Sequence, residues 1–379
     1  MLRVVEVTAV ALSVDLRDRP ATLGVGTAVK KDTVVVRVRT ADGIVGYGEA
    51  HHANAPQVVA DLVNTNLAPL VVGQDALAVE HVWELIYQKQ GRTHGPGWAL
   101  YKALSGIDMA LWDVRGKALG LPVWALLGGV RRRVRAYAGG VSLGWQTPEA
   151  LAEEAQSYLE RGFSALKLRC GDSVERDLAR VRHVRKVVGQ QVELMVDMNT
   201  RYSLAELLRA LPGLEECGVS WIEEPFPPDA IRDYALAAGR TRIPLAAGEN
   251  HFLRYQARQL LEAEAVHILQ PDASKAGGVT ETKKIADLAA AFRRPFAPHT
   301  SMSGLNAAAS LHLLSACPNA LIYEADVAPR NPFRDELTSP VGQIGPDGCV
   351  EPPAGPGLGV EVDEAVFARY PAIPGPCYV

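Results

Sequence analysis

Cysteine is scarce in this chain, and its few cysteines are not grouped. The 379 residues include five of them, with no CxxC spacing. Scattered thiols of this kind are typical of reduced cysteines rather than of a disulfide framework, so we expect a cytoplasmic protein. The first twenty residues alternate like a strand and lack the basic start, apolar block and cleavage site of a secretory signal.

Long apolar runs and a basic excess are absent as well. Nowhere do 18 apolar residues follow one another, so the sequence predicts no membrane span and no membrane partner. The net charge is −4, whereas a nucleic-acid surface needs a basic excess, and we expect no nucleic-acid partner. With 48% hydrophobic residues, the chain has ample core. Its length allows two or three domains, or one large barrel with an appendage.

The first third of the chain has the pattern of an α+β domain. Residues 1–50 alternate as strands, with a turn expected at residues 41–43. A helix is expected from Gly97 to Leu119, because apolar residues recur there at steps of four and three. Gly120 and Pro122 are expected to end it.

From Arg133 onward, short apolar runs alternate with longer amphipathic ones. The helical patterns include residues 148–160 and 173–188. Eight strand-like runs occur, in the order VRAYA, SALKLR, ELMVDM, SWIEEP, IPLAAGE, AVHILQPD, RPFAPH and ALIYEA. Eight strands separated by helices predict a (β/α)8-type barrel, in which all strands end at one face.

Polar residues stand at the ends of six successive strand-like runs. Each interval is 23 to 27 residues, the length of one strand–helix unit, so the six side chains are expected to meet at the mouth of the barrel. One polar strand end is commonplace, but six in a row favour a functional site over simple solvation. The six residues are Asp197, Glu223, Glu249, Asp272, His299 and Glu324.

Three carboxylates on adjacent strands, Asp197, Glu223 and Glu249, predict a metal site. Oxygen ligands alone favour Mg²⁺, with Mn²⁺ as a possible substitute, over zinc. Glu224 is expected to point elsewhere, either supporting the ligands from behind or lying exposed. Asn199 is equally a contact to substrate or water and a turn former.

The remaining candidates supply proton transfer and positive charge. Beside Asp272, His299 is expected to be a general base, because a carboxylate that orients one imidazole nitrogen leaves the other free to take a proton. Glu324 is a candidate for contacting a developing oxyanion. Lys167 and Arg169 are two residues apart and share a face. If that face is inward, they favour a small-molecule carboxylate substrate, whose weakly acidic alpha proton calls for a metal and a nearby base.

Taken together, these motifs resemble the enolase superfamily and, within it, the mandelate racemase subgroup. The resemblance spans nearly the whole chain. It consists of VDMN, IEEP, GEN, QPD, APH and YEAD at the six strand ends, and of IDMALWDVRGKALGLPVWALLGG before the barrel. It implies a modified (β/α)7β TIM-type barrel with an α+β N-terminal capping domain, Mg²⁺ on Asp197, Glu223 and Glu249, a dyad of His299 and Asp272, and a homo-oligomer.

We expect the capping domain at residues 1–128, the barrel at 129–340, and a C-terminal segment, residues 341–379, that returns to the cap. In the family, cap loops close over the substrate; here these would lie near residues 16–29 and at EAHHANAP. Candidate specificity residues, which are equally ordinary loop residues, are His51, His52, Asn54, Arg92 and His94.

One departure from the family pattern bears on the reaction. The second strand of the family usually carries Lys-x-Lys, and the second lysine is a base on the other face of the substrate carbon. Here that position is Arg169, whose guanidinium keeps its proton at neutral pH and is therefore a poor base. Racemisation needs a base on each face, whereas elimination needs one base and an acid. The sequence therefore favours a dehydratase, a carbon–oxygen lyase that converts an aldonate or aldarate to a 2-keto-3-deoxy acid.

Three other readings stay open. A racemase or epimerase of a 2-hydroxy acid is possible if Arg169 is activated or if water reprotonates the other face. A sugar-lactone cycloisomerase is also possible, because the tail NPFRDEL…GPGLGVEV resembles that of galactarolactone cycloisomerases. The non-enzyme reading is a metal-stabilised barrel without turnover, and the complete set of acidic residues with His299 speaks against it.

Overall fold

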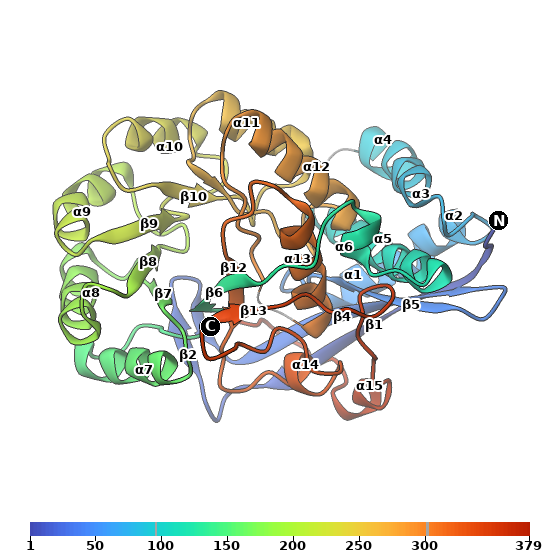
Figure 1. Ribbon diagram of the computed structural model, residues 1–379, viewed down its shortest axis with the longest axis horizontal. Helices are drawn as coiled ribbons and strands as arrows, with labels where there is room; N and C mark the ends of the chain where they lie inside the picture. Colours follow the sequence, from blue (N-terminus) through green and yellow to red (C-terminus); the bar gives the residue numbers. More distant parts are fainter. Residues whose placement is uncertain (95–96, 301–302) are drawn as a thin grey trace.

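A computed structural model describes residues 1–94, 97–300 and 303–379 of the chain (Figure 1). The N-terminal third forms an antiparallel sheet with its own helices. The remainder forms a curled parallel sheet surrounded by helices. This architecture confirms the expected fold, a modified (β/α)7β barrel with an α+β cap. The expected domain limits stay predictions.

The cap is built on a sheet of three long strands in the order β1-β4-β5. These are β1 (Val4–Asp15), β4 (Lys30–Thr40) and β5 (Val45–Ala50), and the hairpin of β2 (Ala21–Leu23) and β3 (Gly26–Ala28) lies between β1 and β4 in sequence. The cap helices are α1 (Pro56–Leu62), α2 (Ala68–Val71), α3 (Val79–Ile86), α4 (Arg92–His94), α5 (Trp98–Leu119) and α6 (Val123–Leu126), with π-helical turns at η1 (Val63–Leu67) and η2 (Tyr87–Gly91).

Helix α5 matches its prediction and joins the cap to the barrel. It ends at Gly120, which takes the left-handed conformation with φ 68°. On one side α5 lies directly against β5, where a Cβ added to Gly48 would come within 2.2 Å of the Gly106 carbonyl oxygen. On the other side, Asp108 accepts a hydrogen bond from the Thr280 backbone N–H at 2.9 Å. The helix is therefore fixed to both parts of the molecule.

The barrel strands run parallel in the order β11-β10-β9-β8-β7-β6-β12 (Figure 1). They are β6 (Val134–Gly139), β7 (Ala165–Arg169), β8 (Glu193–Asp197), β9 (Val219–Glu223), β10 (Leu245–Ala247), β11 (Ile268–Leu269) and β12 (Tyr323–Asp326). The surrounding helices are α7 (Pro148–Glu160), α8 (Val174–Val188), α9 (Leu204–Glu216), α10 (Ile231–Ala238), α11 (Leu253–Glu262), α12 (Gly278–Ala291) and α13 (Gly304–Ala316).

The seventh expected strand, RPFAPH, is not a regular strand. Phe296 alone pairs, through isolated bridges to Leu269 and Ala320. Pro295 and Pro298 stand on either side and lack the N–H that a strand ladder needs, so pairing cannot extend. The two bridges still join β11 to the segment before β12 and complete the ring.

The C-terminal segment returns to the cap, as the family resemblance implies. Helix α14 (Pro332–Asp335) precedes this segment, which contains β13 (Cys349–Val350), paired with β6, and α15 (Ala365–Arg369). Beyond α15 the chain runs along the cap, where Tyr378 bridges Ala28 and the Val29 N–H donates to the Cys377 carbonyl at 2.9 Å. In the part of the chain that the structure describes, no helix is long and apolar enough to cross a membrane.

One apolar layer fills the inside of the barrel below the mouth. Each of the eight chain segments around the barrel contributes one buried residue. Tyr137 packs edge to face against Trp221, with the ring centres 5.5 Å apart. The layer consists of Tyr137, Ala165, Met195, Trp221, Ala246, Ile268, Ala297 and Ile322. Such layers make a barrel interior a packed core rather than a pore, and they set the floor of the site above.

Candidate active site

The candidate site is the next layer of side chains above this apolar floor. Side chains alternate along a strand, so the residue two positions beyond each floor residue points to the same inner face. This relationship places one polar layer at the mouth, and all of its members are buried. They are Lys167, Asp197, Glu223, Gln270, His299 and Glu324.

Lys167 lies at the centre of this layer and holds its carboxylates together. Its Nζ is 2.8 Å from Glu324 Oε1 and 3.8 Å from Asp197 Oδ2, and it also contacts Glu223. Burial lowers the pKa of Lys167, but the surrounding carboxylates outweigh burial and raise it overall. Lys167 is thus a fixed cation rather than a base.

Arg169 faces the mouth two residues further along β7. Its guanidinium contacts the Asp197 carboxylate and the Gly140 carbonyl oxygen. Burial lowers the pKa of Arg169, whereas Asp197, Glu324 and Glu223 raise it, and the net direction is upward. The guanidinium therefore stays charged and supplies no lone pair for proton abstraction.

The expected pairing of His299 with Asp272 is present. His299 Nδ1 is 2.6 Å from Asp272 Oδ2. Asp272 Oδ1 accepts from the N–H and hydroxyl of Ser274, at 2.7 and 2.6 Å, and from Asn306 Nδ2 at 3.1 Å. These donors fix the carboxylate, which in turn fixes the imidazole.

Electrostatics shift the pKa values of the two members of this pair in opposite directions. Burial raises the pKa of Asp272, but His299 and Lys275 lower it overall, so the carboxylate is ionised. Burial lowers the pKa of His299, yet the nearby carboxylates, led by Glu249, raise it overall. His299 Nε2, the nitrogen opposite the one that binds Asp272, is 3.1 Å from Glu249 Oε2.

The three expected metal ligands each contact a cation in this structure. Asp197 contacts Arg169, Glu223 contacts Lys167, and Glu249 Oε1 is 2.8 Å from Lys275 Nζ. A different group of described residues has its possible ligand atoms gathered within 4.8 Å of one another. These residues are Asp32, His52 and Cys377.

The chemistry of the three carboxylates nevertheless fits a hard divalent cation. Burial and the neighbouring carboxylates of Asp197, Glu324 and Glu249 outweigh Lys167, and together these effects raise the pKa of Glu223 to about 7. In addition, the buried Oδ1 of Asn199 and Oε1 of Glu224 have no hydrogen-bond partner among the described residues. Crowded carboxylates with spare oxygens nearby are a donor set that Mg²⁺ or Mn²⁺ would neutralise.

Glu224 and Asn199 support the ligands through the backbone and from behind. Both have positive φ, 37° and 44°, which turns the chain sharply after each ligand. Glu224 is buried and accepts from Asn250 Nδ2 at 2.8 Å, so of the two expected positions it takes the supporting one. The Asn199 N–H donates to Asp197 Oδ1 at 2.8 Å.

A cavity of about 200 Å³ opens above this layer, between barrel, cap and tail. The barrel contributes Arg169, Asn199, Glu249, Asn250, Lys275 and His299; the cap contributes His51, His52, Asn54 and Lys102; and the tail contributes Tyr378. Of the expected specificity residues, Arg92 does not line this cavity; it is exposed and donates to Gln88 Oε1 at 2.9 Å. The side chain of His94 lies outside the described residues.

Sequence reasoning missed two lysines in the cavity wall. Lys275 follows Asp272 by only three residues, and a cation directly after a strand-end motif was an available signal. Lys102 is the one lysine or arginine among the buried residues of α5, and a basic residue within an apolar helical pattern is unusual. Tyr378 gave no signal, because nothing in a local pattern reveals that the tail returns to the mouth.

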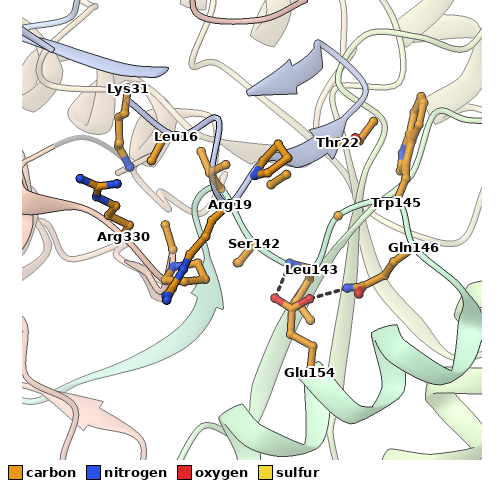
Figure 2. Close-up of a pocket in the computed structure, with 16 residues that line it drawn as sticks. Leu16, Arg19, Thr22, Lys31, Ser142, Leu143, Trp145, Gln146, Glu154 and Arg330 are labelled. Atoms are coloured by element: carbon orange, nitrogen blue, oxygen red, sulfur yellow. Dashed lines mark hydrogen bonds between the residues drawn. The ribbon is translucent and has the colours of Figure 1, made fainter. Parts of the chain in front are cut away.

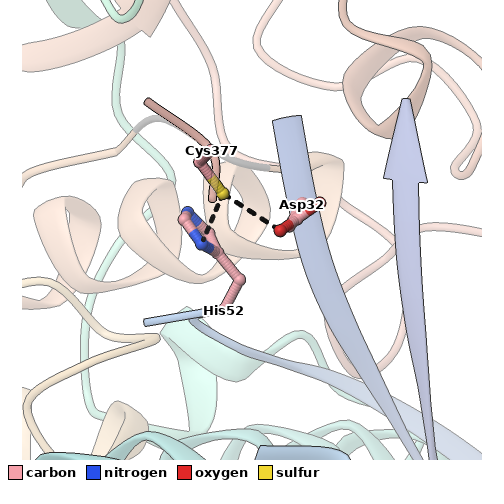
Figure 3. Close-up of side chains that lie close together, drawn as sticks. All are labelled: Asp32, His52 and Cys377. Atoms are coloured by element: carbon pink, nitrogen blue, oxygen red, sulfur yellow. Dashed lines mark hydrogen bonds between the residues drawn. The ribbon is translucent and has the colours of Figure 1, made fainter. Parts of the chain in front are cut away.

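The wall beneath His52 is a buried cluster of Asp32, His52 and Cys377 (Figure 3). The Cys377 thiol donates to Asp32 Oδ2 at 3.0 Å, and its Sγ is 3.6 Å from His52 Nδ1. Lys30 Nζ is 2.9 Å from the same Asp32 oxygen and already neutralises it. The cluster therefore ties the tail to the cap and fixes the His52 ring.

A second cavity, of about 340 Å³, lies beside the first, and Val141 lines both. Its walls are the loop of residues 141–146, the cap segment 19–22 and residues 328–330 (Figure 2). Glu154 holds the loop in place by accepting from the Leu143 N–H at 2.9 Å. No residue of the polar layer lines this cavity.

Comparison with known proteins identifies the class that this fold and site define. Residues 4–128 match the mandelate racemase / muconate lactonizing enzyme N-terminal domain, and residues 150–366 match the enolase C-terminal domain-like family. The chain belongs to the enolase superfamily, in its mandelate racemase / muconate lactonizing enzyme subgroup. The resemblance drawn from the sequence motifs is confirmed.

Characterised relatives carry out more than one reaction. The chain is 33% identical to arabinonate dehydratase of Saccharolobus solfataricus, over 89% of this chain and 90% of the relative. It is 34% identical to D-galactonate dehydratase of Ralstonia nicotianae, over 87% and 89%, and 35% identical to D-galactarolactone cycloisomerase of Agrobacterium fabrum, over 89% and 90%. A solved enolase-superfamily structure from Polaromonas sp. JS666 has a TM-score of 0.97 at 47% identity, with both chains fully covered.

Proposed function

We propose that this enzyme is a divalent-metal-dependent acid-sugar dehydratase that converts an aldonate or aldarate to a 2-keto-3-deoxy acid. The observation that carries the proposal is the pairing of one base with one permanent cation across the cavity. His299 is held by Asp272 at 2.6 Å, and the position of the family's second base is taken by Arg169, bound to Asp197. One-face chemistry suits elimination better than racemisation.

In this proposal Asp197, Glu223 and Glu249 hold Mg²⁺, with Mn²⁺ as a substitute. The metal supplies positive charge at the substrate carboxylate, which makes the alpha proton more acidic. Arg169 and Lys167 add fixed positive charge on the same side, and Glu324 is kept in place by Lys167 Nζ at 2.8 Å.

The chain's own proton chemistry centres on His299. Its Nε2 accepts the alpha proton, and Asp272 stabilises the imidazolium that forms. The C–H electron pair becomes the new carbon–carbon double bond, and the bond from the β-carbon to its hydroxyl breaks. Protonated His299 is placed to return the proton to that hydroxyl, which leaves as water, and the resulting enol ketonises to the 2-keto-3-deoxy acid.

The relatives support this proposal and provide its main rival. Two of the three relatives above are dehydratases of sugar acids, and the third is a lactone cycloisomerase at 35% identity. A cycloisomerase also needs only one base at the alpha carbon, so Arg169 does not argue against it. A racemase or epimerase is the weaker candidate, because it needs a competent base where Arg169 stands.

A single incubation separates these functions. Enzyme with Mg²⁺ is incubated in D₂O with a panel of aldonates, aldarates and aldarolactones, and the products are followed by NMR and mass spectrometry. A 2-keto-3-deoxy acid supports the dehydratase. Inverted, deuterated substrate marks a racemase, and conversion confined to lactones marks a cycloisomerase. Absence of any exchange or product across the panel would support the non-enzyme alternative, a metal-stabilised barrel without turnover.

A further inference from the structure

Lys102 is a buried lysine in the cavity wall that has no anionic partner among the described residues. Only 8% of its surface is exposed, although it lines the cavity. Its Nζ lies 5.8 Å from the ring centres of Trp98 and Phe252, and it forms no ion pair with a carboxylate in the part of the chain that the structure describes. By contrast, Arg169 and Lys275, the other lysine and arginine side chains in the described cavity wall, contact Asp197 and Glu249. Burial of an unpaired ammonium is costly, so its retention in the wall calls for a ligand.

Two neighbouring imidazoles add neutral hydrogen-bond donors. The rings of His51 and His52 stack at 4.2 Å, and both side chains line the cavity. The Ala53 N–H donates to His51 Nδ1 and the Asn54 N–H donates to His52 Nδ1, each at 3.0 Å. An Nδ1 that accepts a hydrogen bond is unprotonated, so each neutral ring carries its proton on Nε2 and can donate it. The pKa of both rings lies well below the usual value, mainly because of burial.

These three donors come from the cap, whereas the reacting groups come from the barrel. His299, Arg169 and Glu249 stand at strand ends, and His51, His52 and Lys102 come from the segment after β5 and from α5. A small acid with its reacting carboxylate at the barrel side therefore presents its other end to the cap. The cavity, at about 200 Å³, is smaller than the roughly 300–1,000 Å³ typical of drug-sized ligands, so a short ligand reaches both sides.

We propose that Lys102, with the Nε2–H groups of His51 and His52, forms a subsite for a second carboxylate, and that the substrate is accordingly an aldarate rather than an aldonate. This inference rests on the proposed dehydratase function and names its substrate class. An aldonate carries a hydroxymethyl group at that end, which would leave the Lys102 ammonium buried and uncompensated. A distal carboxylate provides the matching charge and accepts all three donors.

The lowered pKa of Lys102 is consistent with a site that has no anion until a ligand binds. Burial, together with the positive charge of Lys275, lowers it to about 7, although the carboxylates of Asp272 and Glu249 act in the opposite direction. A bound carboxylate would favour the charged form. Replacement of Lys102 by methionine, which has a similar length and no charge, removes this interaction while keeping the apolar contacts to Trp98 and Phe252.

The test compares acid sugars that differ only at the distal carbon. Each hexarate is paired with the hexonate of the same configuration, and kcat/KM is measured for wild type and for Lys102→Met. We expect the hexarate to be preferred by wild type, and Lys102→Met to lower the hexarate-to-hexonate ratio of kcat/KM about 10- to 100-fold. Lys89→Met, the same substitution at an exposed cap lysine, should leave the ratio unchanged.

Binding without turnover provides a second readout. In a His299→Asn background, hexarate should raise the melting temperature, and adding Lys102→Met should remove most of that shift.

If hexonates are dehydrated and hexarates are not, the subsite inference is wrong while the dehydratase proposal stands. Loss of alpha-proton exchange with every acid in Lys102→Met would place Lys102 at the reacting carbon and would also overturn the inference. If neither class is dehydrated, the proposed function fails, and a hexarate shift that depends on Lys102 would still support the subsite.

Discussion

The guanidinium of Arg169 contacts the carboxylate of Asp197 directly, across neighbouring strands at paired positions of β7 and β8. Asp197 is the residue expected to bind metal, and Arg169 stands where the family has a lysine base. One contact thus joins the metal side of the site to the position that decides between elimination and racemisation.

Arg169→Lys should change the proton chemistry of the enzyme more than it changes metal binding. A lysine can lose its proton, whereas the guanidinium cannot, so we expect weak alpha-proton exchange or epimerisation from the opposite face, without faster dehydration. Dehydration should fall, because the contacts to Asp197 and Gly140 are weakened. Deuterium incorporation into recovered substrate measures the new exchange. Arg209→Lys, at an exposed position on α9, is the control.

His299→Asn should abolish both dehydration and alpha-proton exchange, because asparagine has no basic nitrogen. Asp272→Asn should lower kcat by about 10²- to 10⁴-fold, the usual contribution of a positioned acid or base, since the imidazolium loses its stabilising anion. Exchange of the alpha proton in D₂O is the measurement, and exposed His81→Asn is the control. Residual exchange at wild-type rate in His299→Asn would assign the base elsewhere.

Removal of divalent metal should stop turnover, and Mg²⁺ or Mn²⁺ should restore it. Ligand binding to the folded state raises stability by mass action, about 2.7 kcal/mol at a hundredfold excess over Kd, so Mg²⁺ should also raise the melting temperature of chelated protein. Glu223→Gln should weaken both effects together, and Glu160→Gln, exposed at the end of α7, should weaken neither. Full activity after exhaustive chelation would contradict the metal assignment.

Asp108→Asn should make stability less dependent on pH. Burial raises the pKa of Asp108 from its usual 3.8 to about 7, chiefly by disfavouring the ionised form. Because the folded pKa lies above the unfolded one, the stabilisation from this group is complete below about pH 4 and is lost as the pH rises through 7. The loss amounts to as much as about 4 kcal/mol, at about 1.4 kcal/mol per unit.

Denaturant unfolding of wild type and Asp108→Asn between pH 4 and pH 8 checks this prediction. The variant should gain stability relative to wild type as the pH rises, because asparagine has no charge to bury. Asp61→Asn, at an exposed cap position, should follow wild type. Parallel curves for Asp108→Asn and wild type would show that Asp108 is ionised throughout.

The fold and the polar layer were predictable because they depend on local periodicity. Spacings of 23 to 27 residues predict that the six strand ends share one face, and the alternation of strand side chains explains why Lys167 joins them. The seventh strand was overestimated, since its apolar pattern is strand-like although two prolines prevent pairing beyond Phe296. The pattern of apolar and polar residues does not reveal that Pro295 and Pro298 lack N–H groups; only the identity of each residue does.

The cavity wall was less predictable because it is assembled from distant segments. Lys102, Tyr378 and Asn54 meet there although they are far apart in sequence. Arg92 was a plausible cap contact by position, but its place on the exposed side of α4 follows from helix packing that a single sequence does not specify. Side chains whose position is set by tertiary contacts thus escape pattern analysis, even where the strand ends do not.

The docking of α5 against both β5 and α12 has a consequence for how substrate reaches the mouth. The close approach at Gly48 and the bond from Thr280 to Asp108 hold α5 against both the cap sheet and the barrel. We therefore expect substrate to enter and leave through movements of the short segments that line the cavity, Leu23 to Val25 and His51 to Asn54. Loop fluctuations of this size occur in nanoseconds to microseconds, faster than domain closure, so access should be gated quickly and product release should not await a domain motion.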